Sequence, residues 1–274
     1  MDKVTTVIKP SAGWRSIDFK ELIRYRDLLW FLTVRGIKAK YAQSVLGVSW
    51  AVIQPLFSTL VFTVVFGNLA KIDSNGVSYF LFSFCALVPW TFFSATLTDS
   101  ANSLVANASM ISKVYFPRMV LPLSSILSKG VDFIIALLLL IVFLISYRFV
   151  PSWQVVFLPW IILVLLMTSL GIGMLLSAMA VQYRDIKHAM TFGVQLLMYA
   201  APVVYPTSNV PEPYQQWYVF NPMVGVIESF RSVFLGTIAF PYEWLAWGTL
   251  TSSVLFVLGL FYFRKMERVF ADVA

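Results

Sequence analysis

Charged residues are scarce in this sequence. Only 12% of its 274 residues are Asp, Glu, Lys or Arg, whereas an ordinary soluble domain has about 25%. Hydrophobic residues make up 59% of the chain, and its mean hydropathy is +0.80. The single core of a soluble protein of this length cannot enclose so much apolar surface. The composition therefore argues against a soluble enzyme, a disordered chain and a nucleic-acid-binding domain.

Cysteine and histidine are almost absent. Cys85 is the single cysteine, so it cannot form a disulfide within the chain. His188 is the single histidine and has no cysteine cluster beside it, so we predict no metal site. The Gly-x-x-x-x-Gly-Lys-Ser/Thr loop that binds phosphates is also missing. We therefore expect no ATP hydrolysis by this chain, and we assign no catalytic residues.

Long apolar runs are the main positive feature of the sequence. A bilayer core of about 30 Å requires about 20 apolar residues in a helix, and backbone groups in lipid are satisfied inside helices. The runs are too long and too continuous for barrel strands. We predict an all-α integral membrane protein with a cytoplasmic N-terminal region, 1–47, and a transmembrane domain, 48–274. Its six predicted spans are residues 48–69, 79–97, 124–147, 153–180, 189–205 and 244–263.

The basic residues predict the orientation of these spans. The net charge is +7, and sixteen of the 20 Lys and Arg residues fall on one predicted side. Positive residues concentrate on the cytoplasmic side of membrane proteins. Both termini are therefore predicted to be cytoplasmic, as an even number of spans requires.

The segment 18–47 is too charged to cross a membrane. Asp18 followed by Glu21 favours a helix start. Basic and apolar residues then fall on different arcs of a helix, which predicts an amphipathic helix on the inner membrane surface. It either only anchors the chain or also contacts a cytoplasmic partner. The apolar arc holds Phe19, Leu22, Ile23, Leu29, Trp30, Val34 and Ile37, and the polar arc holds Lys20, Arg24, Asp27, Arg35 and Lys38.

Two connections are more than plain loops. Residues 98–123 are polar and contain Pro117 and Pro122, which predicts a short helix at the cytoplasmic face and a turn into the third span. Residues 206–243 begin with turn-forming prolines and continue in an apolar segment that is too short to span. We expect short re-entrant gate helices there, between spans five and six. Glu228 and Arg231 are spaced i,i+3 in this segment, so they can form either a weak surface salt bridge or a buried pair.

Polar residues inside two spans are candidates for function. Lys129 and Asp132 lie i,i+3 in the third span and are predicted to pair with each other, with a proton relay as the alternative. Phe192, Gln195 and Tyr199 share one face of the fifth span. Rings with an amide and a hydroxyl suit a surface that slides along sugars. The alternative for this face is a contact between helices.

Several motifs, in order, resemble the permeases of one transporter family. Arg35-Gly-Ile-Lys-Ala-Lys-Tyr-Ala-Gln-Ser-Val-Leu-Gly47 leads into Trp50 and Gln54-Pro55. Lys113-Val-Tyr-Phe-Pro-Arg118 precedes Pro122, and Tyr183-Arg-Asp-Ile186 follows span four. Pro202-Val-Val-Tyr-Pro206 and Asn221-Pro222 with Glu228 and Arg231 complete the set. The chain is similar to ABC-2 type transporter permeases, especially polysaccharide exporters, over most of its length.

This resemblance implies a permease subunit of an ATP-driven exporter in the bacterial plasma (inner) membrane. Such a permease works as a homodimer with two copies of a cytoplasmic ATP-binding subunit and moves lipid-linked O-antigen, capsule or teichoic acid chains. The resemblance further implies that ATP and magnesium would bind to the partner, and that this chain would bind no cofactor. Contact with the ATPase would involve Asn107, Lys113, Tyr115, Arg118, Tyr183, Arg184 and Asp185. Asn221, Pro222, Glu228 and Arg231 would form an outer gate, and Phe192, Gln195 and Tyr199 would line the channel.

Three other functions stay open. An exporter of drugs or small lipids belongs to the same family. A membrane-embedded glycosyl-transfer enzyme needs a polar cluster at a membrane face, where Glu212, Glu228, Arg231 and Glu243 are the few candidates. A secondary transporter should show internal repeats with broken helices, and no clear repeat relates spans one to three with spans four to six.

Overall fold

The described part of the chain, residues 19–42 and 44–267, folds as a bundle of helices without strands in a computed structural model. The predicted tail and helix start at Asp18, like the basic residue Arg268, lie outside the described residues. Within the described part, five segments are long and apolar enough to cross a membrane. They are Gly47–Leu69, Tyr79–Ala106, Val120–Ser146, Trp153–Gln182 and Tyr242–Glu267.

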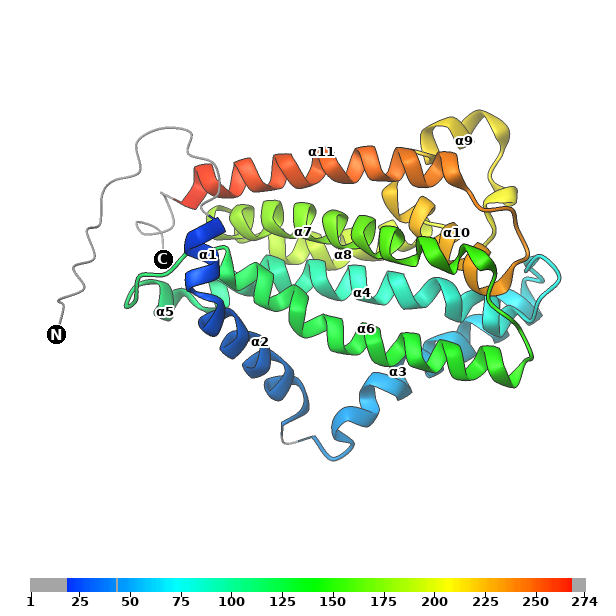
Figure 1. Cartoon of the computed structure of the whole chain (residues 1–274), viewed down its shortest axis with the longest axis horizontal. Helices are drawn as coiled ribbons and strands as arrows, with labels where there is room; N and C mark the ends of the chain where they lie inside the picture. Colours follow the sequence, from blue (N-terminus) through cyan, green and yellow to red (C-terminus); the bar gives the residue numbers. More distant parts are fainter. Residues whose placement is uncertain (1–18, 43, 268–274) are drawn as a thin grey trace.

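These five segments contain the long helices of Figure 1. The first segment joins η1 (Gly47–Ser49), α3 (Trp50–Phe62) and the π-helical turn η2 (Thr63–Leu69). The others contain α4 (Tyr79–Ala106), α6 (Val120–Ser146), η3 (Trp153–Phe157) with α7 (Leu158–Gln182), and α11 (Tyr242–Glu267).

α4 is the central helix of the bundle. It packs against α3, α6, α7, α8 (Ile186–Tyr199) and α10 (Pro222–Leu235), so most of its side chains are buried. Its sequence has no polar stripe along its first 18 residues, and a helix that is apolar all round is buried on all sides. α4 therefore positions the residues of its neighbours.

The helices α7 and α11 pack closely because small residues face each other. A Cβ atom placed on Gly259 would lie 2.0 Å from the carbonyl oxygen of Gly171. Hydroxyl groups add a contact, since the Oγ atoms of Thr168 and Ser252 lie 2.7 Å apart. Small residues and hydroxyl hydrogen bonds are the usual basis of helix association in lipid.

The helix of span two extends nine residues beyond its predicted end, and the helix of span three begins four residues before its predicted start. α4 continues to Ala106 through the segment predicted as a polar connection, because its polar side chains bond inside the helix. For example, the Asn102 amide donates to the Thr98 carbonyl oxygen at 2.8 Å. α6 begins at Val120, and Pro122 lies in its first turn, where a missing N–H is tolerated. The predicted short helix between these spans is α5 (Ala108–Ile111).

The continuous helix predicted over residues 189–205 is wrong. α8 has 14 residues and ends at Tyr199, so its length is about 21 Å, below the roughly 30 Å of a bilayer core. Residues 200–206 follow in turns without a helix. The six-span topology therefore stays a prediction.

The N-terminal region contains two helices, α1 (Phe19–Arg24) and α2 (Arg26–Tyr41), separated at Tyr25. α2 packs against α6 and buries Leu32 and Thr33, neither of which lies on the predicted apolar arc. Trp30 belongs to that arc and is 69% exposed. A membrane surface could cover it, so the amphipathic interface helix stays a prediction.

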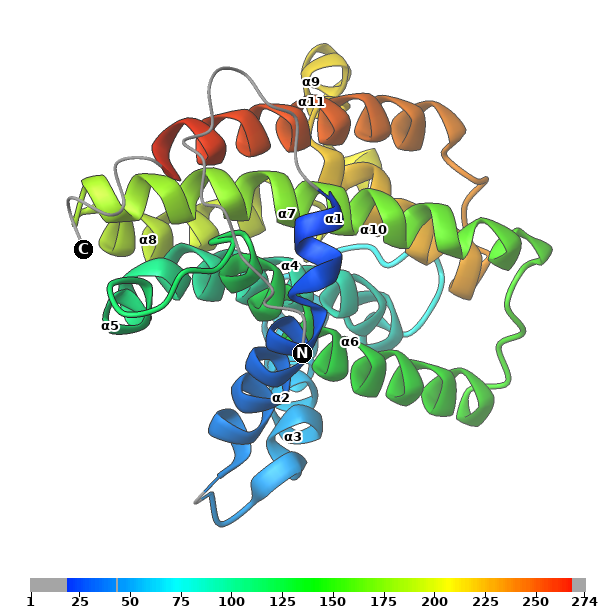
Figure 2. The ribbon, with the colours of Figure 1, turned by 60° about the vertical axis from the view of Figure 1, so that its left-hand side comes forward.

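The two ends of the bundle differ in what they carry. Figure 1 shows α1, α5 and the C-terminal end of α11 at one end, and α9 (Glu212–Tyr218) with α10 at the other. In Figure 2, α2 and α3 project together from the body of the bundle. The described ends of the chain thus lie on one side, opposite the predicted outer segment.

Candidate functional site

A cavity of about 350 Å³ lies among α2, α3, α4 and α6. Its wall holds four charged side chains, Lys40, Asp99, Lys129 and Asp132. Charged residues inside the hydrocarbon layer are costly, and they are retained where they pair or face water. The cavity is therefore the first candidate site of the bundle.

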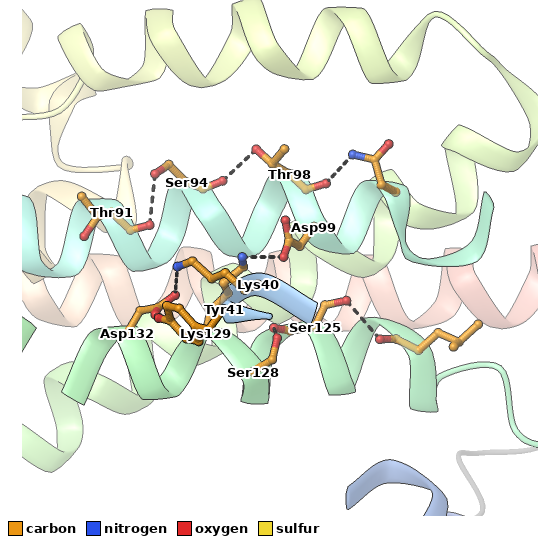
Figure 3. Close-up of polar contacts among 12 residues, drawn as sticks. Lys40, Tyr41, Thr91, Ser94, Thr98, Asp99, Ser125, Ser128, Lys129 and Asp132 are labelled. Carbon is orange, nitrogen blue, oxygen red and sulfur yellow. Dashed lines mark hydrogen bonds and ion pairs between the residues drawn. The ribbon is translucent and has the colours of Figure 1, made fainter. Parts of the chain in front are cut away.

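The predicted pair of Lys129 with Asp132 is wrong. The Lys129 Nζ lies 2.6 Å from an Asp99 carboxylate oxygen on α4. Asp132 instead accepts from the Lys40 Nζ at 2.5 Å and from the Tyr41 hydroxyl, both on α2. Figure 3 shows these two pairings side by side. Residues three apart on α6 point to different neighbouring helices, so the four charges connect α2, α6 and α4.

Tyr41 supports this arrangement as a hydrogen-bond donor. Burial raises the pKa of its phenol, and the hydrogen bond to the Asp132 carboxylate raises it further. The phenol therefore stays protonated at neutral pH and holds one carboxylate oxygen. The motif around Tyr41 was singled out from the sequence, but nothing in the local spacing reveals a partner 91 residues away.

A second buried cluster surrounds Arg231 on α10. Every residue of α10 is buried, and Arg231 and Glu228 are 0% and 1% exposed. The Arg231 Nη1 donates to a Glu228 carboxylate oxygen at 2.9 Å, and its guanidinium lies 3.6 Å from the ring centroid of Phe82. Of the two readings of this pair, the surface salt bridge is excluded.

Arg231 also satisfies the backbone of the non-helical segment 200–206. Its Nη2 donates to the Val203 carbonyl oxygen at 3.0 Å, and the Tyr79 hydroxyl donates to the Val204 carbonyl oxygen at 2.6 Å. Irregular backbone at membrane depth is stable only with such internal partners. Sequence reasoning missed Tyr79 and Phe82, because both lie on α4 and contact residues far away in the chain.

Asn221 and Pro222 lie at the start of α10. The Asn221 side-chain oxygen accepts from the Met223 N–H at 3.1 Å, which caps the helix, and Pro222 is at its first position. The Asn221 amide also donates to the Ala200 carbonyl oxygen at 2.9 Å. All four residues predicted for an outer gate thus lie on α10 or its cap, and Asn221 and Arg231 contact the segment that follows α8.

The residues predicted to contact an ATPase fall in two exposed segments. The turn between α7 and α8 carries Tyr183, Arg184 and Asp185, all exposed. Lys113 is exposed after α5, whereas the Asn107 amide donates to the Ser103 carbonyl oxygen at 2.8 Å.

The α5–α6 connection is tied to both described ends of the chain. The Tyr115 hydroxyl donates to a Glu21 carboxylate oxygen at 3.3 Å. The Arg118 guanidinium donates to the Glu267 carbonyl oxygen, and the Arg118 N–H donates to a Glu267 carboxylate oxygen at 3.3 Å. Sequence reasoning used Glu21 only as a helix-start signal and did not single out Glu267, because both contacts join residues far apart in the chain.

The predicted channel residues lie on the exposed side of α8. Phe192 and Tyr199 are 63% and 55% exposed, and Gln195 is exposed between them. None of the three lines the cavity, which Val194 reaches instead. Among the described residues, no group of three His, Cys, Asp or Glu side chains is placed to hold a metal ion.

Comparison with known proteins identifies similar sequences. The family model described as ABC-2 type transporter matches residues 27–235. An O-antigen export system permease protein RfbA of Klebsiella pneumoniae is 30% identical over 249 residues, covering 90% of this chain and 95% of the relative. One of Myxococcus xanthus is 31% identical over 78% of this chain and 83% of the relative. The polysialic acid transport protein KpsM of Escherichia coli is 24% identical over 73% of this chain and 78% of the relative.

Proposed function

The chain belongs to the ABC-2 type transporter family, and we propose that it is the permease subunit of an ATP-driven exporter of lipid-linked polysaccharide. The observation that carries this function is the near full-length match to permeases named for O-antigen export. Polysialic acid and capsule export proteins among the relatives support a glycan substrate. None of the relatives described above is named for export of drugs or small lipids.

A separate ATP-binding partner is part of this proposal. The sequence lacks a phosphate loop of its own, and members of this family are membrane subunits. Two exposed segments, after α5 and between α7 and α8, would receive the partner's motion through Lys113, Tyr183, Arg184 and Asp185. Asn107, Tyr115 and Arg118 would pass it to α4, α1 and α11, which they contact. ATP and magnesium would bind to the partner, and no cofactor to this chain.

A homodimer is the second part of the proposal. Apolar side chains are exposed along α3 and α8, including Phe57 at 65% and Phe192 at 63%. A second copy facing them would enclose Phe192, Gln195 and Tyr199 at a channel. The short α8, the segment 200–206 and α10 would then serve together as the fifth crossing and the outer gate. The 1–47 region would lie on the cytoplasmic surface of a bacterial inner membrane, with both termini inside, as the basic residues favour.

Reconstitution tests this function. The chain is purified with a candidate ATP-binding partner subunit and placed in proteoliposomes that contain a lipid-linked oligosaccharide. We expect ATP-dependent appearance of the glycan on the opposite face, and none when the ATPase carries a substitution in its own phosphate loop. Transport by this chain alone, driven by a proton gradient, would contradict the proposal and favour a secondary transporter.

A further inference from the structure

We propose that the cavity among α2, α3, α4 and α6 binds sugar hydroxyl groups of the exported glycan. This inference rests on the proposed function. It assigns a binding site separate from the exposed face of α8, where the channel residues were predicted. Lys40, Asp99, Lys129 and Asp132 are its polar groups.

The position of the charges along α4 and α6 favours a cavity that is open to water. Lys129 follows Val120, the first residue of α6, by nine positions, which is about 13 Å along a helix axis. Asp99 precedes Ala106, the last residue of α4, by seven positions, or about 10 Å. Ionisable groups at this depth face water or protein rather than lipid, and they commonly mark substrate pathways. Lys40, at the end of α2, lies where the cavity meets the bundle surface.

The charge balance favours sugar hydroxyls over phosphate. Two ammonium groups and two carboxylates line the cavity, so their formal charges cancel. A phosphate drawn to the lysines would also meet the carboxylates of Asp99 and Asp132. A hydroxyl group both donates and accepts hydrogen bonds, so it can bond to either member of each ion pair without disturbing the charge balance.

Donors and acceptors are both available at the wall. An ammonium has three N–H donors, and within the described residues Lys129 has one ion-pair partner, Asp99. Thr91 and Thr98 donate their hydroxyl protons to the carbonyl oxygens of Leu87 and Ser94, at 2.8 and 3.0 Å. Their oxygens therefore keep lone pairs for a ligand, and Figure 3 shows both residues along α4, with Thr98 next to Asp99.

An apolar surface completes the site. Phe92 and Phe133 line the cavity with ring centroids 5.2 Å apart. The two rings are 5% and 9% exposed, so they give the cavity a narrow apolar wall for the C–H groups of a sugar ring. The cavity volume falls in the range of small-molecule sites. A mixed wall of ion pairs, hydroxyls and rings matches a sugar, whose own surface alternates polar and apolar groups.

Cysteine labelling tests occupancy of the cavity. Ser94→Cys is introduced into the full chain in complex with its ATPase, and its rate of reaction with a water-soluble maleimide is measured. The parent chain gives the background, since its one cysteine, Cys85, is buried. Ser208→Cys is the matched control, because Ser208 is also a serine, is exposed outside the five candidate spans and does not line the cavity.

We expect a polyprenyl-phosphate-linked hexasaccharide to slow labelling of Ser94→Cys at least five-fold and to leave labelling of Ser208→Cys unchanged. The same polyprenyl phosphate without sugar, and inorganic phosphate, should have no effect. Equal protection by either phosphate probe would overturn the sugar assignment, and so would the lack of protection by the glycan. If the wild-type complex exports no glycan at all, the proposed function fails as well. If it exports glycan but the glycan does not protect Ser94→Cys, only this inference fails.

Removing both charges separates binding from bracing. The double variant Asp99→Leu/Lys129→Met leaves no unpaired charge between α4 and α6. We expect normal assembly and a KM for the lipid-linked glycan raised about ten-fold, because the cavity loses both donors and acceptors. An unchanged KM would mean that the charges only brace the helices, and the proposal would fall.

Discussion

Replacing Arg231 by methionine should destabilise the protein strongly. The change keeps much of the side-chain volume but removes the partner of Glu228, which is 1% exposed, and a donor to the Val203 carbonyl oxygen. Removing one member of a buried ion pair costs about 3–5 kcal/mol, because the other charge stays buried and unpaired. For a domain of this size, each kcal/mol lowers Tm by about 2–4 °C, so we expect a fall of roughly 6–20 °C.

A double-variant comparison shows whether the unpaired charge is the cause. Glu228→Gln in combination with Arg231→Met removes both charges, so it should cost less than Arg231→Met alone. Tm in a single detergent, measured by intrinsic fluorescence, is the assay, and Arg148→Met is the matched control because Arg148 is exposed. A Tm for Arg231→Met within about 2 °C of wild type, or a double variant less stable than the single one, would refute the reasoning.

Three further predictions concern packing, coupling and the channel. Gly259→Leu should prevent stable folding, because even a Cβ there meets the Gly171 carbonyl oxygen at 2.0 Å; gel filtration should show aggregation, whereas Leu258→Ala at an exposed neighbouring position should behave as wild type. Arg184→Glu should reduce export several-fold at unchanged membrane level, since its exposed turn would meet the ATPase; unchanged export would leave Arg184 as an orientation signal only. Tyr199→Ala should slow export with dimer assembly intact, and loss of the dimer in cross-linking would instead indicate a packing role.

Local sequence patterns predicted much of the bundle. Runs of apolar residues identified five of the observed long helices, because length and hydropathy are properties of each segment alone. The ordered motifs predicted the family, which the comparisons confirm. The errors fell at polar helix ends: Thr98 and Asn102 looked like loop residues, yet both bond to carbonyl oxygens inside α4.

Part of the candidate site was visible in the sequence, and part was not. The spacing of Glu228 and Arg231 predicted their contact correctly, since residues three apart lie on one face of a helix. The same rule failed for Lys129 and Asp132, because Asp99 and Lys40 on other helices lie within reach of them. Helical spacing predicts which residues can contact each other on one helix. It gives no information about competing partners on a neighbouring helix.

The sequence by itself determined the membrane class, the family and the positions of the apolar helices, because composition and local periodicity act segment by segment. Only the tertiary structure decided that α10 is buried, that Arg231 supports the carbonyl groups of residues 203 and 205, and that four charges surround one cavity. These features depend on contacts between residues far apart in the chain. Their energies come from burial and pairing, which exist only once the helices have packed.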